Sequence, residues 1–407
     1  MLKRYFLNNK KRNFSTALIW IKGGSDEDSV GKKGINKILC SLLTRGCEGF
    51  DNFSLSEYIE SYGAELNQEV FEDGISISIK SLNEHFSKVL PLLDLIINKP
   101  NLSEIEFQKV KKSSIDFIKK DKENPFNICF EKWRKIVYSN HPYAYNTNGN
   151  RNDVSNITYK DVLSEFKNFK NREKFIISNN SEINGEDLGK LDQEVLKEES
   201  MSVNLDLDST NRFFYLNNDS NQTIIMLGNQ TCSRRSNEYL ILKVLEAYLS
   251  YGMSAALFKL FREKNGLTYD LGVFNPVRND NAPFLVYFSV SNKNALFAFE
   301  LLSSLWKNLL SKPLIADEMF LAKQKLKGSF LLGNQSLDEI LQRNIQLISY
   351  GVPPISESDL NLMIDEISSS DIIQLTNKYF SKPFLCISGN KKICFEIKER
   401  WRKNFLF

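Results

Sequence analysis

Apolar residues in the first 180 positions recur with two different periods, which predict a mixture of strands and helices. Residues 75–79 alternate isoleucine with serine, as expected for a strand with one buried face. Residues 86–97 place apolar side chains every three or four positions, as on one face of a helix. The predicted strands are 15–22, 75–79 and 174–178, and the predicted helices are 34–43, 55–61, 86–97, 103–120 and 161–169.

The same order of elements returns after a polar, acidic stretch. The second set comprises strands 223–227 and 284–290, helices 239–249, 255–264 and 295–310, and a long helix ending near residue 332. A Lys-Pro pair precedes the long helix in both halves, and residues 99–117 align with 312–330 without a gap. This order indicates duplication of one α+β unit, each a sheet with helices packed on one face. We predict domains at 1–190 and 212–407, joined by a linker at 191–211.

Composition excludes several classes of protein. The chain has 407 residues and a net charge of +3, too small to indicate nucleic-acid binding. No apolar run approaches the roughly 20 residues of a membrane span, and the basic N-terminus lacks the apolar core of a secretory signal. The six cysteines lie far apart, which favours a reduced, cytoplasmic location. The only two histidines, His85 and His141, lie in unrelated segments, so no histidine-rich metal site can be assembled.

Residues 34–46, GINKILCSLLTRG, carry the frame of a zinc-binding helix without its ligands. They resemble the run G-L-x-H-x-L-E-H-x-L-x-x-G of the insulinase / mitochondrial processing peptidase family. In that family two histidines bind zinc and the glutamate activates the metal-bound water. The two histidine positions are Lys37 and Ser41 here, and the glutamate position is Cys40. The resemblance therefore implies a metallopeptidase domain that holds no metal, and we expect Cys40 to be a buried apolar residue rather than a reactive thiol.

The family's third zinc ligand is a glutamate on the long helix after the Lys-Pro break. A gapless alignment places this position at Phe117, and Asp116 is the nearest acidic residue. A single carboxylate without imidazole partners binds zinc poorly, since zinc sites need several converging ligands. We interpret Asp116 as a solvated helix residue.

A second motif lies in the later half. Residues 252–269, GMSAALFKLFREKNGLTY, resemble the family's G-M-S-S-R-L-F-x-x-x-R-E-K-x-G-L-x-Y, except that Ala256 replaces an arginine. In the family, the arginine and tyrosine matched by Arg262 and Tyr269 reach the substrate near the metal from the non-catalytic domain. The alternative is that Arg262 complements a helix C-terminus, Gly266 caps the helix and Tyr269 is a half-buried aromatic residue.

The resemblance implies a fold of two homologous α/β-roll domains with mixed or antiparallel sheets. It also implies a non-catalytic, substrate-binding subunit of a heterodimeric zinc metallopeptidase. This chain would be inactive alone, and zinc would be held by a homologous partner with an intact H-x-x-E-H motif. Arg262 and Tyr269 would act in trans on an extended peptide that adds to a sheet edge of the partner.

Two other functions stay open at this level. The chain could be an inert scaffold or binding protein, like the family's core subunits of a respiratory complex, with Arg262 and Tyr269 as relics. An autonomous peptidase with a different metal site is disfavoured by the distance between the two histidines. The sequence does not identify the peptide, nor does it exclude a homodimer of the isolated chain.

Overall fold

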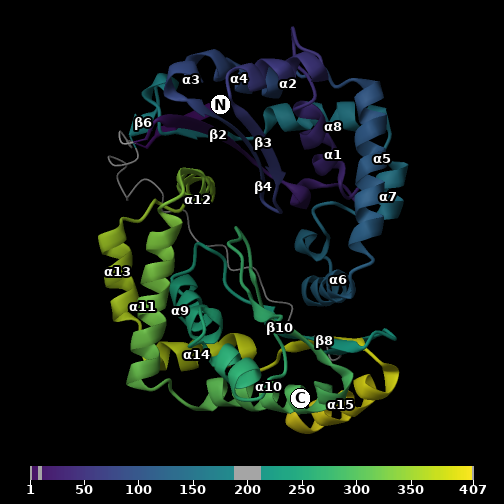
Figure 1. Cartoon of the computed structure of the whole chain (residues 1–407), viewed down its shortest axis with the longest axis vertical. Helices are drawn as coiled ribbons and strands as arrows, with labels where there is room; N and C mark the ends of the chain where they lie inside the picture. The colour runs from purple at the N-terminus through teal and green to yellow at the C-terminus, as the bar shows by residue number, and fades with distance from the viewer. Residues whose placement is uncertain (1, 8–11, 188–211, 406–407) are drawn as a thin grey trace. The chain divides into compact units, whose positions relative to one another are not determined.

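The computed structural model describes residues 2–7, 12–187 and 212–405 (Figure 1), so the predicted linker at 191–211 lies outside the described residues. The chain divides into two compact units. Among the described residues, unit 1 contains 2–7, 12–123, 140–187 and 333–354. Unit 2 contains 124–139, 212–332 and 355–405.

Unit 1 is built on a six-stranded mixed sheet with the order β3-β4-β2-β5-β1-β6. Strand β1 pairs in parallel with β5 and β6, and the remaining pairs are antiparallel. The isoleucines of the predicted strand 75–79 are fully buried in β4, but Ser76 is buried as well, so the strand does not have only one buried face as predicted. The strands are β1 Leu2–Phe6, β2 Phe14–Lys22, β3 Glu65–Val70, β4 Gly74–Leu82, β5 Lys174–Ser178 and β6 Glu186–Asp187.

Helices α2, α3 and α4 lie along one face of this sheet, as Figure 1 shows, and α1 packs on α5 and α8. Residues 86–97, predicted as one helix, belong to two, because Pro91 begins a new helix. The helices are α1 Ile35–Leu43, α2 Asn52–Ser61, α3 Asn83–Val89, α4 Pro91–Asn98, α5 Glu104–Asp121, α7 Arg151–Asn156 and α8 Tyr159–Asn171, with 3₁₀ turns η1 Ser25–Glu27, η2 Pro142–Ala144 and η3 Ser181–Ile183.

Unit 2 has a five-stranded sheet with the order β7-β11-β8-β10-β9, in which only β7 and β11 are parallel. Its strands are β7 Phe213–Asn217, β8 Gln222–Gln230, β9 Leu271–Phe274, β10 Pro283–Ser291 and β11 Phe384–Gly389. Its helices are α9 Tyr239–Ser250, the π-helix η6 Phe258–Glu263, the 3₁₀ turn η7 Asn292–Asn294, α10 Ala295–Ser311, α11 Ala316–Gly333, α13 Glu357–Glu366, α14 Ser369–Phe380 and α15 Lys391–Asn404.

The two sheets have the same topology. In the sheet of unit 1, neighbouring strands have the order β1, β5, β2, β4 and β3. The corresponding order in unit 2 is β7, β11, β8, β10 and β9. The corresponding helices α8 and α14 both begin with a capping box, formed by Thr158 with Asp161 and by Ser368 with Asp371. Shared strand order and shared capping support the predicted duplication.

Each unit also contains one helix from the other half of the sequence. Helix α6, Pro125–Tyr138, packs on β8 and β11 of unit 2, and helix α12, Leu337–Ser349, packs on β2 and β5 of unit 1. Helix α12 buries Leu341 and Ile345 against Leu18 and Trp20, on the sheet face opposite the main core. The compact units therefore differ from the contiguous domains 1–190 and 212–407, and the sheet of unit 1 has helices on both faces rather than one.

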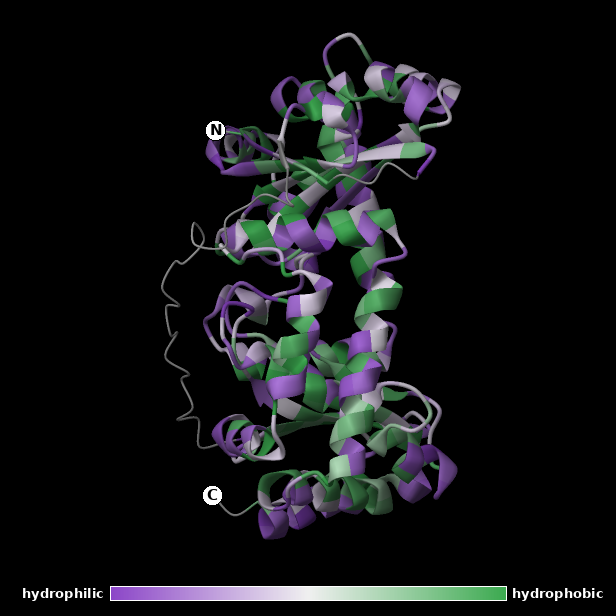
Figure 2. Ribbon diagram, turned by 90° about the vertical axis from the view of Figure 1, so that its left-hand side faces the viewer, coloured by the Kyte–Doolittle hydropathy of each residue, from purple (hydrophilic) through white to green (hydrophobic). Residues whose placement is uncertain are grey.

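Surface helices carry both hydrophilic and hydrophobic positions, as Figure 2 shows by colour. Helix α12 is an example, since its buried positions Leu337, Leu341, Ile345 and Ile348 recur at helical spacing. Within the described ranges, no helix combines the length and the apolar character needed to cross a bilayer.

Candidate functional site

The helix that carries the first motif, α1, is anchored at its N-terminus by Asp28. The Asp28 carboxylate accepts hydrogen bonds from the backbone N–H of Gly34 at 2.6 Å and from that of Asn36 at 3.1 Å. The Asn36 side chain donates to the same carboxylate at 2.8 Å. Gly34 has φ +99°, and a Cβ atom there would lie 2.7 Å from the Asn148 carbonyl oxygen. Glycine is therefore required where the chain turns into the helix.

The residues on α1 at the family's two ligand positions and at its glutamate position are unsuited to a zinc site. Lys37 and Ser41 are half-buried, and Cys40 is fully buried. The Cys40 thiol donates to Gln68 Oε1 at 3.6 Å. Burial raises the pKa of Cys40 to about 12, so the thiol stays protonated near neutral pH. A neutral thiol is a poor metal ligand and cannot act as the base that the family's glutamate provides. Cys40 is therefore a buried residue, as expected, and not a reactive thiol.

The position of the third ligand lies on α5, which packs against α1. Phe117 is 54% exposed and offers no donor atom to a metal. Asp116 is exposed, and its carboxylate lies 3.5 Å from the ammonium group of Lys119, as expected of a solvated helix residue. Among the described residues, no three His, Cys, Asp or Glu side chains form a group that could hold a metal ion. The residues present therefore do not fit a zinc ion at the family position.

Two acidic side chains, half-buried Asp26 and buried Asp73, lie next to the anchor of α1. The Asp26 carboxylate accepts from the backbone N–H groups of Gly24 at 2.7 Å and Glu27 at 2.9 Å. Nearby Asp73 accepts from the hydroxyl groups of Tyr143 and Tyr350. Burial, together with the charge of Asp73, raises the pKa of Asp26 to about 7. Sequence inspection gave no sign of this pair, because exposed and buried aspartates look alike in a polar loop.

We expect Asp26→Asn to stabilise the protein at pH 8. The folded-state pKa of Asp26 lies above its ordinary value of 3.8, so the native state binds more protons between about pH 4 and 7. The free energy of unfolding therefore falls as pH rises through this window. An asparagine keeps the acceptor oxygen and removes the charge, which adds about 2–4 kcal/mol at pH 8 and almost nothing at pH 4. Denaturant unfolding at both pH values measures the difference, with exposed Glu57→Gln as the control. An equal effect at both pH values would contradict it.

The second motif forms a compact loop around a π-helix. The N–H of Lys264 donates to the Lys259 carbonyl, five residues back, at 3.0 Å. Gly266, at φ +58°, donates to the Arg262 carbonyl at 3.0 Å and ends the helix. A helix is therefore present within the predicted range 255–264, but most of it, Phe258–Glu263, is a π-helix, a geometry that is frequent at functional sites.

The structure brings Arg262 and Tyr269 into direct contact. The Arg262 guanidinium carbon lies 4.6 Å from the ring centroid of Tyr269 and 4.8 Å from that of Phe258. The guanidinium group is thus in cation–π contact with two aromatic rings. Phe258 was not singled out in the sequence, although an aromatic residue one helical turn before an arginine is a usable signal.

Both predicted substrate-contact side chains are open to solvent. Tyr269 is 83% exposed, and Arg262 is also exposed. Over the described part of the chain, neither the guanidinium group of Arg262 nor the hydroxyl of Tyr269 has a hydrogen-bond or ion-pair partner. Buried Thr268 fixes the backbone here, since its hydroxyl donates to the Asp270 carbonyl and accepts from the Asp270 N–H, both at 3.1 Å. The pair is therefore positioned by its neighbours, with its donors free.

Ala256, which replaces an arginine of the family pattern, lies beside a small cavity of about 70 Å³ in unit 2. Lys259 and Lys325 also line this cavity. The charge of Lys259 lowers the pKa of Lys325, after the larger effect of burial. The region beside Ala256 therefore contains two lysines, although the arginine of the family pattern is absent.

The fold and the altered motif define a class of two-unit α/β proteins related to zinc peptidases. Residues 4–151 match the family described as insulinase (peptidase family M16), and residues 160–326 match the peptidase M16 inactive domain. The chain belongs to the insulinase (M16) family.

Two curated relatives illustrate the range of similarity. An uncharacterized zinc protease of Rickettsia felis is 24% identical over 368 residues, which cover 88% of each chain. The beta subunit of the mitochondrial-processing peptidase of Neurospora crassa is 23% identical over 154 residues, or 38% of this chain and 32% of that one.

Solved structures show the same fold over nearly the whole chain. A peptidase M16 inactive domain from Pseudomonas fluorescens has a TM-score of 0.79 at 19% identity, covering 96% of this chain and 95% of that one. A protease from Helicobacter pylori has a TM-score of 0.78 at 16% identity, covering 95% and 96%.

Proposed function

We propose that this chain is the non-catalytic, substrate-binding subunit of a heterodimeric zinc peptidase located in the cytoplasm. The observation that carries the proposal is the stack of Arg262 and Tyr269, which is held by Phe258 and has its hydrogen-bond donors open to solvent. The zinc-ligand positions, by contrast, carry Lys37, Ser41 and Phe117, and the position of the glutamate that activates the water carries Cys40. A chain of this kind can bind a peptide, but it needs a partner for the hydrolytic step.

Arg262 and Tyr269 have complementary chemistry toward a peptide. The guanidinium group can donate two parallel hydrogen bonds to a carboxylate or to neighbouring peptide carbonyls. The Tyr269 hydroxyl can donate to the scissile carbonyl oxygen, where negative charge develops during hydrolysis. Contact with the rings of Phe258 and Tyr269 restricts the guanidinium group before substrate arrives, which lowers the entropy lost on binding. The activated water belongs to the partner's metal site.

The proposal is tested by reconstitution. This chain and a homologous chain with an intact H-x-x-E-H motif, expressed separately, should each show little peptidase activity. Mixing them in equal amounts should yield activity against a quenched fluorescent peptide, and a chelator should abolish it. A matched mixture with an unrelated protein serves as the control. Formation of a stable pair without peptidase activity would instead identify a scaffold, and full activity of the partner alone would exclude a role for this chain.

A further inference from the structure

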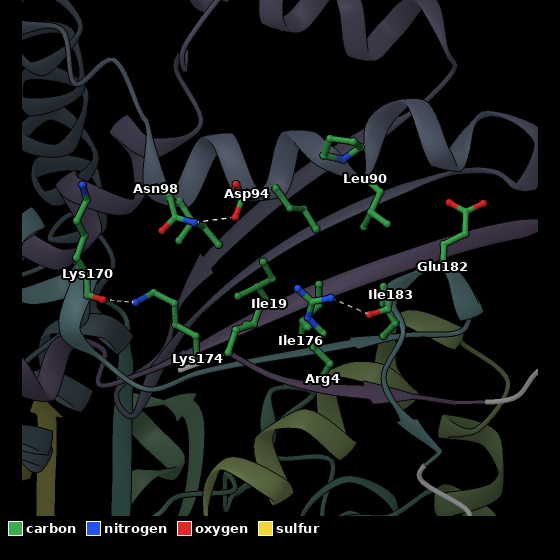
Figure 3. A pocket seen from close by; sticks show the side chains of 14 residues that line it. Arg4, Ile19, Leu90, Asp94, Asn98, Lys170, Lys174, Ile176, Glu182 and Ile183 are labelled. Carbon is green, nitrogen blue, oxygen red and sulfur yellow. Dashed lines mark hydrogen bonds between the residues drawn. The ribbon is translucent and has the colours of Figure 1, made fainter.

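Unit 1 contains a cavity of about 600 Å³ between α4 and the strands β1, β2 and β5 (Figure 3), but its lining groups are already engaged. The isoleucines of its floor, Ile19 and Ile176, are buried in the unit. On its helical side, the Asn98 side chain donates to Asp94 at 2.8 Å. The Lys174 ammonium donates to three backbone carbonyls. These engaged groups do not define a ligand.

Two cysteines from different halves of the sequence lie in contact inside unit 2. The Cys129 thiol of α6 donates to the Cys386 sulfur of β11 at 3.8 Å, although the two residues are 257 positions apart. Both side chains are fully buried. All six cysteines lie within the described residues, and these two are the only pair joined by a hydrogen bond. A thiol–thiol contact between distant segments is the arrangement that a disulfide requires.

The docking of α6 holds the two sulfurs near each other. One helical turn after Cys129, the indole N–H of Trp133 donates to the Phe384 carbonyl of β11 at 3.4 Å. At the end of the helix, the Tyr138 hydroxyl donates to the Asn281 carbonyl at 2.7 Å. A disulfide bond measures about 2.05 Å, so the sulfurs must approach by about 1.8 Å. A change of the χ1 rotamer moves a cysteine sulfur by more than this distance.

The same packing protects the thiols while α6 is docked. The hydrogen bond to Cys386, together with burial, holds the pKa of Cys129 well above its ordinary value. The thiolate is the reactive form of cysteine, so Cys129 does not react in the closed structure. Oxidation therefore requires α6 to separate from the sheet, which exposes both thiols to water.

We propose that Cys129 and Cys386 are a peroxide-sensitive pair, whose oxidation to a disulfide joins α6 covalently to β11. One thiolate attacks a peroxide oxygen, the O–O bond breaks, and the leaving hydroxide takes a proton to become water. The sulfenic acid that results is attacked by the second thiolate, its S–O bond breaks, and a second water leaves. Two thiols and one peroxide thus give one disulfide and two waters, with two electrons passing from sulfur to peroxide.

The bond would connect the two halves of the sequence at one point. Helix α6 is encoded in the first half and β11 near the end of the second, so the linked helix cannot leave unit 2. In a reducing compartment such a disulfide is transient, and thiol reductants reverse it. The pair is independent of Arg262 and Tyr269, so it would operate whether or not the chain assists a peptidase.

Peptide mapping of the full-length chain tests the proposal. The reduced protein is treated with hydrogen peroxide at neutral pH, its remaining thiols are blocked with N-ethylmaleimide in denaturant, and it is digested with trypsin. We expect one cross-linked species, which joins the peptides 123–132 and 379–391 that contain Cys129 and Cys386. Dithiothreitol should release both peptides. The same treatment in urea should give a mixture of pairings, because the unfolded chain does not hold these two thiols together.

Two variants and a second measurement complete the test. Cys232→Ala removes another buried cysteine of unit 2 and should leave the cross-link unchanged. In the linked wild-type chain, amide hydrogen exchange of α6 should slow by at least about tenfold, since the helix can no longer separate. Peroxide should not slow exchange of α6 in Cys386→Ala.

Four results would overturn the proposal. They are the absence of the cross-link in the native chain, an equal amount of Cys386 linked to Cys394, sulfinic acid at Cys129 or Cys386 in place of the link, and unchanged exchange of α6 in the linked chain.

Discussion

Replacing Tyr269 with phenylalanine should lower peptide turnover by the reconstituted pair by about 100-fold to 1,000-fold, the usual effect of losing one donor to a developing oxyanion. The change removes only a hydroxyl that is exposed and has no hydrogen-bond partner among the described residues. The free energy of unfolding should therefore stay within about 0.5 kcal/mol of the original value. Because the hydroxyl acts on the transition state, kcat should fall and KM should change little.

Arg262→Ala should act differently from Tyr269→Phe. The guanidinium group is expected to bind the peptide before and during the reaction, so its loss should raise KM and lower kcat/KM by at least tenfold. Arg262→Lys keeps the charge but loses the planar fork, and it should recover only part of the activity.

Matched controls for these two variants lie in the same unit. Tyr215 on β7 is also exposed, and Arg402 on α15 pairs with Glu399 one turn earlier. Tyr215→Phe and Arg402→Ala should leave turnover unchanged. Wild-type activity of Tyr269→Phe and Arg262→Ala in a working heterodimer would remove the trans-acting role and leave the pair as a relic of the family.

Trp133→Ala should destabilise unit 2 although residue 133 belongs to the first half of the sequence. Trp133 is fully buried on α6, and its indole N–H donates to the Phe384 carbonyl of β11 at 3.4 Å. Truncation of a buried tryptophan costs about 3–5 kcal/mol. Hydrogen exchange followed by mass spectrometry should show faster exchange in β8 and β11, with β2 and β5 unchanged.

The control for this experiment is Phe53→Ala. Phe53 lies on α2 and is 76% exposed, so its loss should not alter exchange in either sheet. If Trp133→Ala instead accelerated exchange in β2 and β5 and left β8 and β11 protected, the assignment of α6 to unit 2 would be wrong.

The sequence predicted many of the strands and helices and their repetition, but it did not predict α6 or any helix after residue 332. Even where an amphipathic pattern shows that a helix has a buried face, it does not show which sheet covers that face, so the exchange of α6 and α12 could not be predicted. Strand β1 was not predicted as a separate element, since LKRYF has no period-two pattern of apolar residues. Strand β1 is stabilised by pairing with the distant strand β5, and the residues of β1 alone do not indicate that pairing.

The candidate site was predictable where family spacing is strict. Arg262 and Tyr269 were selected from a motif, and the structure places them together. Their aromatic neighbour Phe258 was missed, although its position four residues before Arg262 on a predicted helix was a usable signal. The raised pKa of Asp26 could likewise not be predicted from the sequence. It follows from burial beside Asp73, which lies 47 positions later in a different turn.

The reciprocal placement of α6 and α12 has a consequence for biosynthesis. A ribosome synthesises β2 and β5 long before it reaches residue 337, where α12 begins. Until then Leu18, Trp20, Phe175 and Ile177 have no helix to cover them, although they end in one buried cluster with α12. A nascent chain that has not reached α12 therefore exposes an apolar sheet surface during translation. Intermediates of this kind recruit chaperones. If the two halves of the chain are expressed separately, we expect each fragment to aggregate on its own. Each fragment lacks a helix that is encoded only in the other half.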